Sequence, residues 1–181
     1  MNAQKIIFFL LLFENLAWGS EVNGHWQSSC LEPPQKTIRT MVFETQYLTS
    51  ITRVFADPEC LKLAKSFTTE VIYQYKLGRA PIFGHPQKID VYVKKIGLTF
   101  HDSSTIEELN KGNYCGGGWK VGVTKEVSNS ICGDGIEINP GDHRYSILKV
   151  TNGKLFLADF TDATRQERPT TLKDVPALNR N

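Results

Sequence analysis

The chain has 181 residues and a net charge of +2, with 21 Lys and Arg against 19 Asp and Glu. The basic residues are scattered and form no stripe interleaved with aromatic residues, so nucleic acid is not an expected partner. After the first apolar run no other run approaches membrane-spanning length, so the mature protein is expected to be soluble and to have no membrane span.

Residues 1–19 have the features of an export signal. A short start ending in Lys5 precedes an unbroken apolar run over 6–13, and Ala17 and Gly19 are small residues where a signal peptidase cleaves. The run is too short for a stable anchor, and a buried N-terminal helix would be amphipathic and capped. We therefore predict cleavage after Gly19, with Ser20 as a near alternative, and a secreted or periplasmic protein.

Residues 20–160 are predicted to form one domain built from short antiparallel strands. Apolar and polar residues alternate with a period of two over 67–76 and again over 88–94. After Lys94 and Lys95 the apolar parity changes, as an extra residue in a β-bulge would produce. Many short strands with few helices predict an all-β fold, either a closed or partly open barrel or a sandwich.

Helix signals are few. Residues 103–109 predict a capped helical turn or two that ends at Gly112, and residues 58–64 predict another short helix.

The clearest turn is Asn152-Gly153, which suits a two-residue type I′ hairpin. Its register pairs Val150 with Leu155 on an interior face, and a mixed face follows around Phe156 and Phe160. Residues 161–181, with two prolines and little alternation, are predicted to be a tail packed on the barrel or trailing from it.

The chain has four cysteines, and an even number in an oxidising compartment indicates disulfides, with three possible pairings. A zinc site is disfavoured because no C-x-x-C pair is present. We predict Cys30 with Cys60 and Cys115 with Cys132, because each pair is local in order and brackets one or two strands.

A series of landmarks carries a family resemblance. Gly24-His25-Trp26 is similar to the G-x-W of lipocalins, in which the tryptophan plugs one end of the barrel. The landmarks that follow it are WQSSC at 26–30, RTMVFE at 39–44, FADPEC at 55–60, CGGGWKVG at 115–122, CG at 132–133, LFL at 155–157 and RPT at 168–170. Their order resembles that of the APCDD domain, a family of extracellular antagonists of Wnt signalling.

The resemblance implies an antiparallel lipocalin-like barrel whose apolar cavity accepts a lipid chain. It also implies that Trp26 is buried with an arginine from the C-terminal segment across its ring, a role that we assign to Arg168. Trp119 is expected beside a disulfide and a close approach of the backbone at the three glycines before it. The animal family has two such domains and a membrane anchor, so Wnt antagonism is not carried over to this chain.

Catalytic and metal signatures are weak, and we predict neither an enzyme nor a metal or cofactor. No G-x-S-x-G elbow occurs, and no G-K-[ST] follows the glycines. His101-Asp102 and Asp142-His143 could meet as a metal site, but pairs on surface loops are the commoner explanation. The acidic residues Asp57, Asp159 and Asp162 are explained as well by turns and caps as by acid catalysis.

The predicted function is binding of a hydrophobic or lipid-like small molecule in a barrel cavity, with Tyr73 or Tyr75 bonding a head group at the mouth. The predicted lining residues are Val71, Tyr73, Tyr75, Ile89, Val91, Val93, Leu98 and Phe100. A filled core is the plain alternative for this set. A second hypothesis is a protein-binding module or inhibitor that uses loops or the face around Phe156 and Phe160. A third is a lipid-modifying hydrolase.

Overall fold

The computed structural model describes residues 21–31, 36–55, 57, 59–61, 67–79, 84–128, 139–160 and 168–181. The predicted export signal lies outside these residues. The described elements are β1 (Gly24–Ser28), β2 (Lys36–Phe43), β3 (Tyr47–Phe55), β4 (Phe67–Leu77), β5 (Gln87–Phe100), α2 (Ser103–Lys111), η1 (Tyr114–Gly116), β6 (Lys125–Glu126), β7 (His143–Thr151), β8 (Lys154–Leu157) and β9 (Ala177–Arg180).

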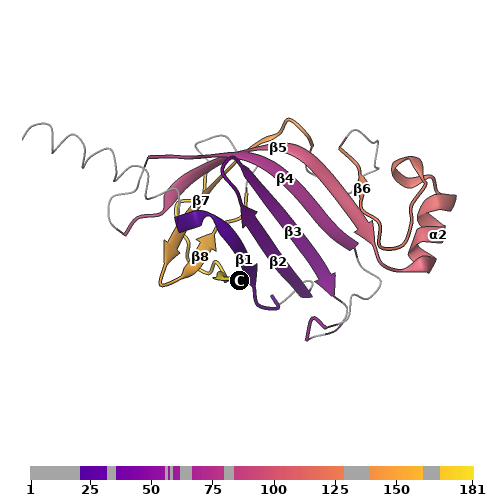
Figure 1. Cartoon of the computed structure of the whole chain (residues 1–181), viewed down its shortest axis with the longest axis horizontal. Helices are drawn as coiled ribbons and strands as arrows, with labels where there is room; N and C mark the ends of the chain where they lie inside the picture. The colour runs from indigo at the N-terminus through magenta and orange to yellow at the C-terminus, as the bar shows by residue number, and fades with distance from the viewer. Residues whose placement is uncertain are drawn as a thin grey trace, which may run out of the picture.

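The strands form one antiparallel sheet that closes on itself. Its order is β4-β3-β2-β1-β9-β8-β7-β5, and the pairing of β4 with β5 completes a ring of eight strands. Neighbours in the ring follow chain order, apart from the short β6, which pairs with the second half of β5. Figure 1 shows β2 to β5 as a curved wall, with β7 and β8 behind it and α2 at one end. The predicted all-β barrel is confirmed.

A β-bulge in β5 bends this wall. Tyr73 of β4 pairs with Val93 and Ile72 pairs with Lys95, so Lys94 is the extra residue on β5. Before the bulge β5 pairs with β7, and after it with β6. The predicted bulge is confirmed, and it lies where β5 exchanges one neighbour for another.

The turn between β7 and β8 also has the predicted form. Asn152 and Gly153 have φ of 51° and 71°, the positive values that a type I′ turn requires. Val150 pairs with Leu155 and Leu148 with Leu157, as the alternation predicts.

The helix α2 begins one residue after its cap. The Asp102 carboxylate accepts a hydrogen bond from the Thr105 N–H at 2.7 Å, and Gly112 is the C-cap. Ile106 is the buried residue of the helix. The helix expected over 58–64 lies largely outside the described residues.

The C-terminal residues are not a tail, and that prediction is wrong for its last part. Residues 177–180 form β9, which pairs with β1 on one side and β8 on the other. Only Leu178 of this strand is buried. Four residues with one buried side chain are too few for an alternation to be recognised in the sequence. The hydrogen bonds to two neighbours stabilise the strand instead.

One predicted disulfide is confirmed, between Cys30 after β1 and Cys60 in the β3–β4 connection, with Cα atoms 5.9 Å apart. Cys115 is also disulfide-bonded, while Cys132 lies outside the described residues. No helix among the described residues is long and apolar enough to cross a membrane.

Candidate ligand-binding site

The strand register defines the inner face of the barrel. Residues directly opposite each other in antiparallel strands lie on the same face. Trp26 is opposite Met41, Met41 opposite Ser50, Ser50 opposite Val71, and Val71 opposite Ile96. Four of these five side chains are in the buried apolar core. Alternate residues on each strand therefore face the interior, and this row crosses it.

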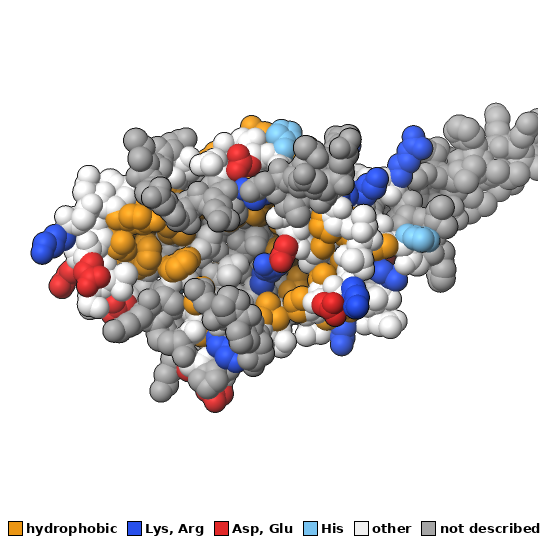
Figure 2. Space-filling view, turned by 180° about the vertical axis from the view of Figure 1, so that it is seen from behind, with side chains coloured by type: hydrophobic (Ala, Val, Ile, Leu, Met, Phe, Trp, Pro, Cys, Tyr) orange, Lys and Arg blue, Asp and Glu red, His pale blue; other side chains and the backbone are white. Residues whose placement is uncertain are grey.

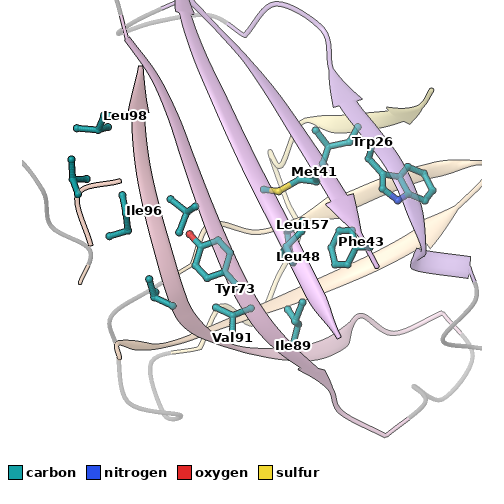
Figure 3. Packing of buried hydrophobic residues seen from close by; sticks show 14 of the residues in the cluster. Trp26, Met41, Phe43, Leu48, Tyr73, Ile89, Val91, Ile96, Leu98 and Leu157 are labelled. Atoms are coloured by element: carbon teal, nitrogen blue, oxygen red, sulfur yellow. The ribbon is translucent and has the colours of Figure 1, made fainter. Parts of the chain in front are cut away.

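One end of the barrel, which we call the Trp26 end, is packed and apolar. Trp26 is fully buried, and its indole N–H donates to the Val22 carbonyl at 2.7 Å. Figure 3 shows Met41, Phe43, Leu48 and Leu157 gathered near it. The guanidinium of Arg180 lies 5.0 Å from the centre of the indole ring. Trp26 therefore has the buried position that the lipocalin resemblance predicts.

The arginine at this tryptophan is Arg180, so the assignment to Arg168 is wrong. Arg180 is the direct β9 partner of Trp26 on β1, and a tail without strand pairing would have no such partner. Arg168 instead donates to the carbonyls of Ile89 and Ser146, at 2.8 and 2.7 Å, and forms an ion pair with Asp90. Its role is to join β5 to β7.

Towards the opposite end, which we call the mouth, the inner face becomes polar and reachable by solvent. On β2 the inner face passes from buried Phe43 and Met41 to half-buried Arg39. On β3 it passes from buried Leu48 to half-buried Ser50, with Thr52 beyond. The interior is therefore amphipathic along its axis.

At the mouth, five residues form what we call the mouth cluster: Arg39, Tyr73, Arg144, Asp159 and Phe160. The Arg39 guanidinium donates to the Asp159 carboxylate at 2.9 Å. The next residue, Phe160, lies against Tyr73 with ring centroids 5.2 Å apart. Arg144 is the inward-facing β7 partner of Val91 and pairs with Asp142 at 3.2 Å.

Tyr73 is the most buried member of the mouth cluster, with 3% of its surface exposed. Burial raises its pKa to about 12, because the phenolate would be poorly solvated, although the charges of Arg144 and Arg39 oppose this shift. Its hydroxyl therefore remains a hydrogen-bond donor near neutral pH. No described residue forms a hydrogen bond with that hydroxyl.

The eight predicted lining residues all lie on the inner face, six of them before the bulge of β5 or on β4 and two of them beyond it. Val71, Tyr73, Ile89, Val91 and Val93 are buried in the barrel core, with Tyr75 packed against it. The Tyr75 hydroxyl, however, donates to the Glu44 carbonyl at 2.8 Å in the β2–β3 turn. That turn lies at the Trp26 end, so Tyr75 cannot meet a head group at the mouth.

Leu98 and Phe100 lie beyond the bulge of β5, in the same buried cluster as the other lining residues. Figure 3 shows Ile96 and Leu98 apart from the residues around Trp26, with Tyr73 between them. The Phe100 ring meets that of Trp119 edge to face, with centroids 4.9 Å apart. This part of the buried cluster packs beside α2. Seen from behind, Figure 2 shows hydrophobic side chains at the α2 end and a second group across the molecule, with an acidic and a basic side chain between them.

The loop before Trp119 is held by polar contacts. The Trp119 N–H donates to the Asn110 side chain at 2.7 Å, and the Lys125 ammonium lies 4.9 Å from the indole centre. The glycines at 116–118 all have positive φ, and a side chain at Gly116 or Gly118 would meet no atom within 4 Å. Glycine is needed at these positions for the positive φ of the backbone. The predicted close approach of another part of the chain is found only at Gly117.

The histidine–aspartate pairs have separate structural contacts. His101 bonds Thr68 at 2.9 Å while Asp102 caps α2, and His143 packs on Tyr92 while Asp142 pairs with Arg144. In the described part of the chain, no three His, Cys, Asp or Glu side chains are placed to hold a metal ion.

Arg39 and Arg144 are not among the site residues predicted from the sequence. Both have a usable signal, because each lies at an inward position of a strand, two residues from a buried inner-face residue, Met41 or Ser146.

A scan against models of protein families finds no match to this chain, and a search of curated proteins finds none either.

Proposed function

We propose that the protein is an exported binding protein that holds a hydrophobic or lipid-like small molecule in its barrel. The observation that carries the proposal is the change along the inner face, from buried apolar residues at the Trp26 end to half-buried Arg39, Ser50 and Thr52 towards the mouth. A core that served only stability would have no need of inward polar side chains. Barrels of eight strands have room for one small ligand.

An acyl chain suits this gradient. Each methylene moved from water to an apolar interior contributes roughly 0.8 kcal/mol, so about eight to ten methylenes would offset the freedom lost on binding and leave micromolar affinity. The landmarks shared with the APCDD domain support the same proposal, because that resemblance implies a barrel that accepts a lipid chain.

The test is titration of the purified protein with Nile red, an uncharged dye that fluoresces in apolar surroundings. Ser50→Trp places an indole in the interior, opposite Met41 and Val71. We expect about a tenfold loss of dye affinity, since the indole displaces roughly two methylenes' worth of buried ligand. Thr49→Trp is the matched control, because the neighbouring residue faces outward on the same strand.

The outcome is decisive in both directions. Binding that is weakened by Ser50→Trp and unchanged by Thr49→Trp supports a ligand in the barrel. Absent dye binding, or equal effects of the two variants when both remain folded, would contradict it. Native mass spectrometry for a co-purified lipid provides an independent check.

The protein-binding alternative has less support from the structure. The face proposed for it contains Phe156, which points outward opposite Lys149 and Ala177. Phe160, its other large aromatic residue, lies instead in the mouth cluster against Tyr73. The outer face therefore has one of the two aromatic anchors that this alternative requires.

A further inference from the structure

We infer that the ligand is a single-chain amphiphile with a monoanionic head group, such as a fatty acid, and that Asp159 competes with this head group for Arg39. The inference rests on the proposed function and specifies the chemistry of the ligand. It depends on three features of the mouth: its donors, the occupant that it already has, and its charge balance.

The donors are Arg39, Tyr73 and Arg144. Both guanidinium charges act on the Tyr73 hydroxyl, since both lower its pKa against the effect of burial. The hydroxyl is protonated near neutral pH and has no hydrogen-bond partner among the described residues. Two guanidinium charges that act on one buried phenol favour an anion over a neutral or cationic group.

The chain itself already places a carboxylate at this position. Asp159 binds Arg39, and the adjacent Phe160 places an apolar ring on Tyr73. The segment is fixed as far as Ala158, whose N–H donates to the Ile147 carbonyl at 3.1 Å and whose carbonyl accepts from Ser146 at 2.7 Å. Asp159 and Phe160 together present a carboxylate and an apolar group to Arg39 and Tyr73, as the head group and chain of an amphiphile would.

The internal occupant is weakly held. The Asp159 side chain is 83% exposed and that of Arg39 is 33% exposed, and such exposed pairs contribute little to stability. A ligand carboxylate can therefore replace Asp159 at small cost. Displacement of Asp159 leaves the Arg39 guanidinium to pair with the ligand carboxylate, so one carboxylate replaces another and the charge at Arg39 stays balanced.

The test compares three amphiphiles with a twelve-carbon chain, dodecanoate, dodecanol and dodecyltrimethylammonium, as competitors of Nile red below their micelle or solubility limits. We expect dodecanoate to displace the dye at about tenfold lower concentration than dodecanol, because it gains one charge-assisted hydrogen bond. Arg39→Gln should remove this preference and leave dodecanol unchanged. Arg53→Gln is the control, since Arg53 is on the outer face, opposite Ile38 and Thr68.

A second variant tests the competition between Asp159 and the ligand for Arg39, and its exposed position should leave folding unaffected. Asp159→Asn should tighten dodecanoate binding about threefold or more and leave dodecanol unchanged, since the amide is a weaker competitor for Arg39. Glu107→Gln removes another exposed acid, on α2, and should have no effect.

The outcomes separate this inference from the proposed function. Equal displacement by all three amphiphiles, a preference for the ammonium, or a carboxylate preference that survives Arg39→Gln would overturn the anionic head group while the barrel still binds the dye. An unchanged dodecanoate affinity in Asp159→Asn would overturn the competition. Failure of Nile red and of all three amphiphiles to bind would instead overturn the proposed function itself.

Discussion

Two arginines near the C-terminal end of the chain have different surroundings. Arg180 lies over the Trp26 ring and donates to the Asn23 carbonyl at 2.6 Å, with its side chain largely in solvent. The Arg168 side chain is only 8% exposed and joins two backbone carbonyls to Asp90. Removal of a buried donor leaves its acceptors without compensation by water, so the two residues should differ in their contribution to stability.

We expect Arg168→Ala to lower the free energy of unfolding by about 2–4 kcal/mol and Arg180→Ala by about 1 kcal/mol. Urea denaturation followed by circular dichroism would measure both. Arg79→Ala, at an exposed position after β4, is the control and should be close to wild type. A larger effect at Arg180 than at Arg168 would contradict this assignment of roles.

The buried phenol of Tyr73 predicts a loss of stability in alkali. Its folded-state pKa of about 12 is above the ordinary value of 10.0, so the folded protein holds the proton more tightly. The contribution is complete below pH 10 and is lost as pH rises towards 12. Tyr73→Phe should reduce this loss by about 2–3 kcal/mol, measured as unfolding free energy against pH. Tyr47→Phe, at an exposed site, should leave the profile as in wild type.

At the scale of elements, β9 has more influence than its length suggests. Leu178 is 4% exposed and lies opposite Leu155 on β8, with Ser28 of β1 on its other side. A tail resting on the surface would tolerate truncation of any one side chain. A strand that completes the barrel core would not.

We therefore expect Leu178→Ala to lower the free energy of unfolding by about 2–4 kcal/mol, as for other buried leucines. Leu172→Ala, a half-buried leucine before the strand, should lower it by about 1 kcal/mol or less. Thermal denaturation of the two variants beside wild type would show the difference. Similar values for both would indicate that β9 is peripheral.

The elements that sequence could predict are those with repeated local signals. Several residues in succession alternate between apolar and polar in β4 and β5, and the β7–β8 hairpin has a turn dipeptide that needs positive φ. The change of apolar parity in β5 indicates the bulge at Lys94. β9 has a single buried residue, so only its pairing with distant strands defines it. The site was half predictable for the same reason. The apolar inward residues can be predicted from the period of two along each strand. The contact of Arg39 with Asp159 depends on tertiary structure, so no local pattern predicts it.

At the scale of the whole molecule, ligand binding should stabilise the barrel. A ligand that binds only the folded state adds about 2.7 kcal/mol when it is present at a hundred times its Kd. For a domain of this size that corresponds to a rise in Tm of roughly 5–10 °C. Calorimetry with dodecanoate would measure the rise, and it should be much smaller in Ser50→Trp. A Tm that is independent of the amphiphile would contradict binding to the folded barrel.

The pairing of β1 with β9 also decides when the barrel can close during folding. It joins segments far apart along the chain, as the hydrogen bond from Arg180 to the Asn23 carbonyl, 157 positions away, illustrates. Until residues 177–180 join the sheet, β1 and β8 each present an unpaired row of backbone N–H and C=O groups, and such rows readily add strands from other chains. The four residues of β9 therefore cover two strand edges that would otherwise be open to other chains, a role that their own few buried side chains would not suggest.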